Sequence, residues 1–69
     1  MNPDILEYLK DGARQIFDEC DRLADGLQYV MDLAVDINDD LKLGYERDSD
    51  SFGVLYKAAE DAVREAFGR

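Results

Sequence analysis

Apolar residues recur at alternating spacings of three and four over residues 6–41, and this repeat restricts the fold more than any other feature of the chain. Written as heptads with aspartates at position f, the a and d positions are all apolar or small. The a positions are Leu6, Ala13, Cys20, Leu27, Ala34 and Leu41, and the d positions are Leu9, Ile16, Leu23, Val30 and Ile37. Residues spaced in this way share one side of an α-helix, so the pattern indicates helices that pack against helices.

Helix-start and helix-end signals bracket the repeat. Asn2 can cap a helix, and Pro3 suits the first helical position because an N–H there would have no partner in any case. Lys42 and Gly44 are typical of a helix C-terminus. We therefore expect one continuous helix over residues 3–43, about 60 Å long at a rise of about 1.5 Å per residue.

Two glycines inside the repeat favour an alternative. Gly12 and Gly26 each follow an aspartate, and a glycine within a helix costs about 1 kcal/mol relative to alanine. The repeat keeps its phase through both, which favours a continuous helix in which they let a neighbouring helix approach closely. The alternative is a break near Gly26, which would give a three-helix bundle.

A polar segment, residues 44–50, follows the long repeat, and a second three-four repeat predicts a helix over residues 51–67. Its apolar positions are Phe52, Leu55, Ala59, Ala62 and Ala66. The sequence thus predicts an all-α fold in which residues 1–69 form a single helical domain. The expected arrangement is a long and a short helix joined as a helical hairpin.

The two predicted helices differ in length, and this difference predicts a homodimer. The shorter helix would reach only about 25 Å, so the first half of the long helix would keep an uncovered apolar strip. A second copy of the chain would cover that strip and build a small bundle. The residues expected at this dimer contact and core are Leu6, Leu9, Ala13, Ile16, Phe17, Cys20 and Leu23.

Residues that enzymes and cofactor sites use are scarce. The chain has no histidine, which argues against catalytic triads and most zinc sites, and its single cysteine, Cys20, lies at an inward position. No clustered glycine loop, basic face, signal peptide or long apolar run is present, so we expect no cofactor, no direct nucleic-acid binding and no membrane span. We therefore expect a non-enzymatic, cytoplasmic protein.

The stretch DINDDLKLGYER begins like a calcium loop, because Asp36, Asn38 and Asp40 match its first three ligand positions. The pattern then fails. Leu41 stands where a glycine must turn the chain, and Arg47 stands where the bidentate glutamate belongs. We therefore expect no metal site here.

Acidic residues dominate the surface chemistry, with a net charge of −9. Nine of the eleven acids in residues 1–43 are aspartate, a weaker helix former than glutamate, so helix propensity does not explain the choice. Six aspartates share position f, and two tyrosines lie nearby at position c. The residues predicted to contact a partner are Asp4, Asp11, Asp18, Asp25, Asp32, Asp39, Tyr8 and Tyr29.

Three interpretations of this acidic row remain open. The row can be a solvated face. It can also bind and inhibit a basic, nucleic-acid-binding protein, and in size and charge the chain resembles small acidic helical inhibitors that mimic nucleic acid, including phage-type inhibitors, although no motif is shared. Thirdly, the chain can be a regulatory homodimer, adaptor or antitoxin-like protein that uses its apolar helix face. We favour the second interpretation.

Overall fold

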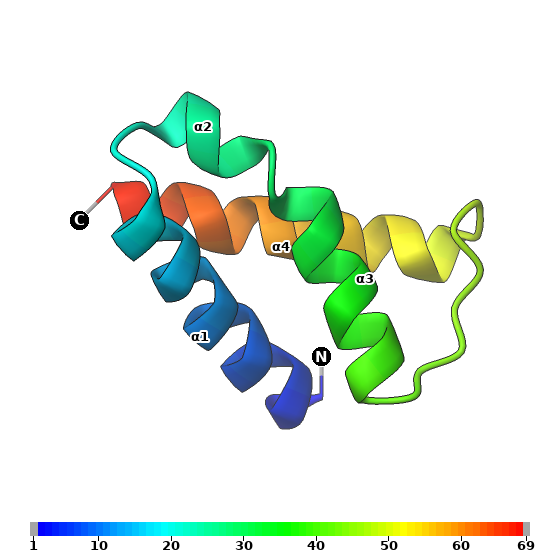
Figure 1. Cartoon of the computed structure of the whole chain (residues 1–69). Coiled ribbons are helices and arrows are strands. Elements are labelled where there is room, and N and C mark those ends of the chain that lie inside the picture. Colours follow the sequence, from blue (N-terminus) through cyan, green and yellow to red (C-terminus); the bar gives the residue numbers. More distant parts are fainter. Residues whose placement is uncertain (1, 69) are drawn as a thin grey trace.

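The computed structural model describes residues 2–68, which form an all-helical fold. The helices are α1 (Pro3–Glu19), α2 (Leu23–Leu27), α3 (Val30–Asp40) and α4 (Asp50–Phe67). α1 and α3 lie side by side across α4, and the short α2 links the end of α1 to the start of α3 (Figure 1). α4 packs against all three other helices, and the described chain measures 32 × 22 × 16 Å.

The prediction of one continuous helix over residues 3–43 is wrong. α1 ends at Glu19, and Cys20 has an extended backbone with φ −120° and ψ 135°. Arg22 is extended as well, and α2 begins only after it. A straight helix would have left its N-terminal half uncovered, whereas the break lets both α1 and α3 pack on α4.

The alternative of a break near Gly26 is closer to the structure, although the chain does not turn at that glycine. Gly26 is buried within α2, and the chain leaves the helical path at residues 20–22 and again at residues 28–29. α1 and α3 each carry a three-four repeat of their own. Residues 20–29 separate the two repeats by a number of residues that preserves the three-four spacing, although they do not join α1 and α3 into one helix.

The second predicted helix is confirmed, with α4 beginning one residue earlier than expected, at Asp50. The Ser49 hydroxyl accepts a hydrogen bond from the Phe52 N–H at 3.2 Å, so Ser49 caps the helix. The Asn2 cap of α1 is also present. Its Oδ1 accepts from the Asp4 N–H at 2.9 Å.

The end of α3 differs from the prediction, because the left-handed residue that follows the helix is Lys42 (φ 54°). Gly44, which the sequence indicated for this role, has a positive φ of 72° farther along the loop. The Leu43 N–H donates to the Asn38 carbonyl at 3.0 Å, which completes a Schellman-type end with Lys42 at its left-handed position.

The core lies where α1 and α3 meet α4. Its buried residues are Ile5, Leu9, Ala13, Val30, Leu33, Ala34, Ile37, Phe52, Leu55, Ala59 and Val63. Leu6, which the heptad placed inward, is 43% exposed, and Ile5 takes the inward position instead. The buried side of α1 is thus rotated relative to the heptad, because this helix packs against α3 as well as α4.

The two glycines inside the long repeat, Gly12 and Gly26, lie at close contacts. A Cβ added at Gly12 would lie 2.3 Å from Leu33 Cδ1, and one added at Gly26 would lie 2.7 Å from Phe67 Cε1. Neither position has room for a side chain unless its neighbour moves. The glycines therefore allow α1 to approach α3 and α2 to approach the end of α4.

Candidate functional site

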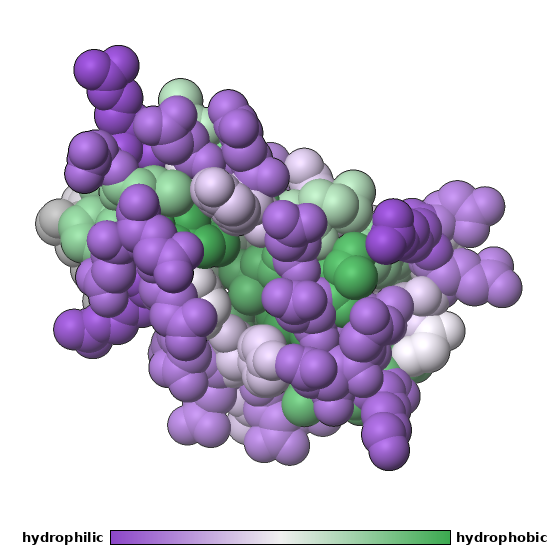
Figure 2. All heavy atoms as spheres, in the orientation of Figure 1, coloured by the Kyte–Doolittle hydropathy of each residue, from purple (hydrophilic) through white to green (hydrophobic). Residues whose placement is uncertain are grey.

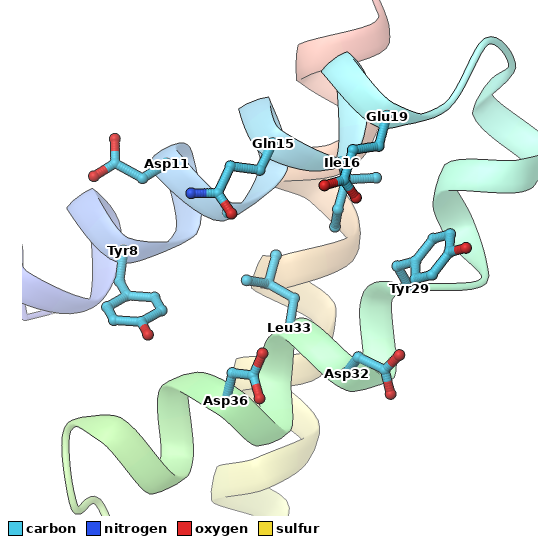
Figure 3. Close-up of a pocket in the computed structure, with 10 residues that line it drawn as sticks. Tyr8, Asp11, Gln15, Ile16, Glu19, Tyr29, Asp32, Leu33 and Asp36 are labelled. Carbon is cyan, nitrogen blue, oxygen red and sulfur yellow. The ribbon is translucent and has the colours of Figure 1, made fainter.

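A groove of about 390 Å³ lies between α1 and α3, and we call it the acidic groove (Figure 3). From α1 it is lined by Tyr8, Asp11, Gly12, Gln15, Ile16 and Glu19. From α3 and the residue before it, the lining is Tyr29, Asp32, Leu33 and Asp36. Two helices that are separate in sequence thus build one concave surface.

The floor of the acidic groove is apolar. Leu33 points from α3 towards α1, where Gly12 leaves space for it, and Ile16 contributes the next apolar side chain (Figure 3). Figure 2 shows hydrophobic residues in the hollow between α1 and α3, with hydrophilic residues on both sides of it. The close approach at Gly12 therefore gives the groove a bottom that water solvates poorly.

The walls of the groove carry four exposed carboxylates, and none of the lining residues is basic. Asp32 and Asp36 are one turn apart on α3, and Asp11 and Glu19 are two turns apart on α1. Asp11 lies at the outer edge, where its carboxylate points away from α3 (Figure 3). Carboxylates on two walls above an apolar floor create a negative potential in the groove.

A hydrogen bond between the helices lies beside the groove. The Tyr8 hydroxyl of α1 donates to Asp40 Oδ2 of α3. This bond, then partial burial and the negative charges of Asp40 and Asp36, raise the pKa of Tyr8 above its ordinary value of 10.0. Tyr8 therefore stays neutral at physiological pH and links α1 to the last turn of α3.

The predicted acidic row is divided by the break after Glu19. Asp11 and Asp32 line the acidic groove together with Tyr8 and Tyr29, the two tyrosines selected from the sequence. The other four members of the row are exposed outside the groove, and they are Asp4, Asp18, Asp25 and Asp39. The row is therefore a surface feature of three different helices, and only part of it faces the concave surface.

Two groove carboxylates, Glu19 and Asp36, were not among the residues predicted to contact a partner. Both lie outside position f, so the choice of one row excluded them. Asp36 follows Asp32 by one helical turn, which was a usable signal. Glu19 follows Gln15 in the same way. The missing information was which flank of each helix faces the other.

The residues predicted at a dimer contact are dispersed. Leu9 and Ala13 are buried within this chain, Ile16 lines the acidic groove, and Cys20 and Leu23 are half-buried. Leu6 and Phe17 remain 43% and 42% exposed. Phe17 also packs edge-to-face on Phe67, with ring centroids 5.1 Å apart. Much of the apolar strip is thus covered by α3 and α4 rather than by a second copy.

Cys20 lies at the break between α1 and α2. Partial burial, followed by the negative charges of Asp25, Glu19 and Asp21, raises the pKa of its thiol, so the thiolate is disfavoured. Among residues 2–68, no group of three or more cysteine, aspartate or glutamate side chains is placed to hold a metal ion. No helix in the described part of the chain combines the length and apolar character needed to cross a membrane.

Comparison of the chain with protein-family models, with curated proteins and with solved structures finds no match. The residues of the acidic groove offer carboxylates, phenol rings and an apolar floor, a combination that suits binding of a cationic ligand.

Proposed function

We propose that this protein binds a basic protein through its acidic surface and thereby inhibits it. The observation that supports this proposal most directly is the acidic groove, where four carboxylates line a concave surface and no lining residue is basic. Exposed carboxylates elsewhere on α1, α2 and α3 extend the negative surface beyond the groove.

Charge and rigidity both favour such a partner. A net charge of −9 repels nucleic-acid phosphates and speeds the encounter with a positively charged surface. Aspartates on helices hold their charges on short side chains, so little conformational entropy is lost when a partner binds them. If the basic surface of the partner normally binds nucleic acid, this protein would cover that surface. The partner could then no longer bind nucleic acid, so binding would inhibit it.

The test is capture of partners from a lysate of the native host at low and high salt, with mass spectrometry of the retained proteins. Basic proteins retained at about 50 mM salt and lost at about 500 mM salt support the proposal, because salt screens contacts between exposed charges. A captured nucleic-acid-binding protein should also lose its nucleic-acid affinity when this protein is added. Retention that does not change with salt would contradict binding through the acidic surface.

A second candidate is a structural or regulatory homodimer, adaptor or antitoxin-like protein that uses an apolar helix face. Its support is the exposure of Leu6 and Phe17, which lie three turns apart on α1. Sedimentation equilibrium at high protein concentration tests this candidate. A dimer that is lost on Phe17→Asp substitution supports it, whereas a compact monomer throughout the concentration range rejects it.

A further inference from the structure

We infer that the acidic groove is the part of the surface that recognises the partner, and that it takes a short arginine-rich segment carrying an apolar side chain. This inference rests on the proposed function and adds to it the place of binding and the chemistry of the bound segment. The carboxylates then have two roles. Those in the groove contact the bound partner, and those outside the groove speed its association.

The apolar floor is the first reason. A purely cationic segment would pair with the carboxylates but leave the exposed part of Ile16 and the edge of Leu33 in water. A purely apolar segment would remove water from the carboxylates without giving them a partner, which is unfavourable. A segment with an apolar side chain between basic ones can pair with the carboxylates of the walls and also cover the apolar floor.

The walls favour arginine over lysine. The planar guanidinium group can donate two parallel hydrogen bonds to a carboxylate, and it also stacks on aromatic rings. The groove offers both partners, because Tyr8 and Tyr29 line it together with the four carboxylates. Tyr29 is 48% exposed, so part of its ring is accessible to an arginine side chain.

The outer carboxylates lack this combination. These carboxylates are exposed and do not line the acidic groove, and they are Asp4, Asp18, Asp25 and Asp39. Contacts between fully solvated charges contribute little to affinity, but their field still speeds association. We therefore expect the outer carboxylates to affect the association rate and the groove carboxylates to affect the dissociation rate.

The test uses two variants with the same change of charge. The groove variant replaces Asp11, Asp32 and Asp36 by asparagine and Glu19 by glutamine. The outer variant replaces Asp4, Asp18, Asp25 and Asp39 by asparagine. Each change raises the net charge from −9 to −5. The replaced side chains are all exposed, and circular dichroism checks that both variants keep the fold.

The probes are two synthetic arginine-rich peptides that differ only in one central residue, leucine or serine. With the leucine peptide, we expect the groove variant to lose about tenfold or more in affinity, through faster dissociation. The outer variant should lose about threefold or less, through slower association. The unmodified protein should bind the leucine peptide more tightly than the serine peptide.

Equal losses in the two variants, or equal binding of the two peptides, would overturn the inference while leaving a basic partner in place. If the unmodified protein binds neither peptide at low salt, the inference is contradicted, whereas the proposed function is decided by the salt dependence of capture of a basic protein. The Tyr29→Ala substitution tests the inference independently, because it changes no charge. It should weaken binding of the leucine peptide, whereas Met31→Ala, at a comparably exposed residue outside the groove, should not.

Discussion

Leu33 of α3 packs directly on Gly12 of α1, so closely that an added Cβ would lie 2.3 Å from its Cδ1. This contact sets the approach of the two helices and forms the floor of the acidic groove. We expect Gly12→Ala to destabilise the fold by about 1 kcal/mol, because the cost of overpacking exceeds the gain in helix propensity. Chemical denaturation measures the change.

The sign of that effect should reverse when Leu33 is shortened. In a Leu33→Ala background the added methyl group meets no clash, and alanine is the better helix former by about 1 kcal/mol. Gly12→Ala should therefore stabilise the Leu33→Ala protein. If Gly12→Ala has the same sign in both backgrounds, the close contact does not determine the effect of the glycine.

Lys42 is the described non-glycine residue with a positive φ, and it follows the end of α3. We expect Lys42→Gly to stabilise the protein by about 0.5–1 kcal/mol, because glycine adopts the left-handed conformation without steric cost. The matched control is Lys10→Gly inside α1, which makes the same charge change and should destabilise by about 1 kcal/mol. Thermal and urea unfolding report both values.

Asn38 holds the loop that follows α3 through two hydrogen bonds to one residue. Its Oδ1 accepts from the Tyr45 N–H at 3.0 Å, and its Nδ2 donates to the Tyr45 carbonyl at 2.9 Å. Removing both bonds with Asn38→Ala should cost about 1–3 kcal/mol. Asn38→Asp keeps the acceptor but places a carboxylate against the carbonyl, so it should also destabilise. Unfolding that is equally resistant to urea in all three proteins would contradict this role.

The hydrogen bond from Tyr8 to Asp40 makes stability depend on alkaline pH. Because the folded-state pKa of Tyr8 lies above its ordinary value of 10.0, the stabilisation is complete below about pH 10 and is lost as pH rises through the folded-state pKa. We expect Tyr8→Phe to make the alkaline loss of stability shallower. Asp40→Asn should act in the same direction by removing the charged acceptor. Identical pH profiles for wild type and Tyr8→Phe would exclude this linkage.

Local signals in the sequence were enough to predict the existence of α4 and the start of α1. The repeat sets the buried side of α4 from Phe52 to Ala59, after which Val63 is buried while Ala62 and Ala66 are half-buried. Each of these features acts within a few residues, so it does not depend on the rest of the fold. The Asn2 cap and Pro3 at the start of α1 were predictable for the same reason.

The break after Glu19 was not predictable from periodicity, because the repeat continues in phase across it. A helix of about 25 Å cannot cover one of about 60 Å. The chain instead breaks the longer segment, so that α1 and α3 both pack on α4. The acidic groove was missed for the same reason. The tyrosines and two of its carboxylates were selected as surface residues, but only the tertiary arrangement shows that Asp36 and Glu19 join them.

α4 packs beneath both walls of the acidic groove, yet every residue that lines the groove precedes α4 in the chain. During synthesis, the ribosome therefore produces all of the groove's charges before it produces the helix that arranges them. Until α4 has emerged and docked, a basic partner would meet only mobile, separately solvated acids. The ability to discriminate among partners would arise late in biosynthesis, with the addition of a segment that contributes no side chain to the groove.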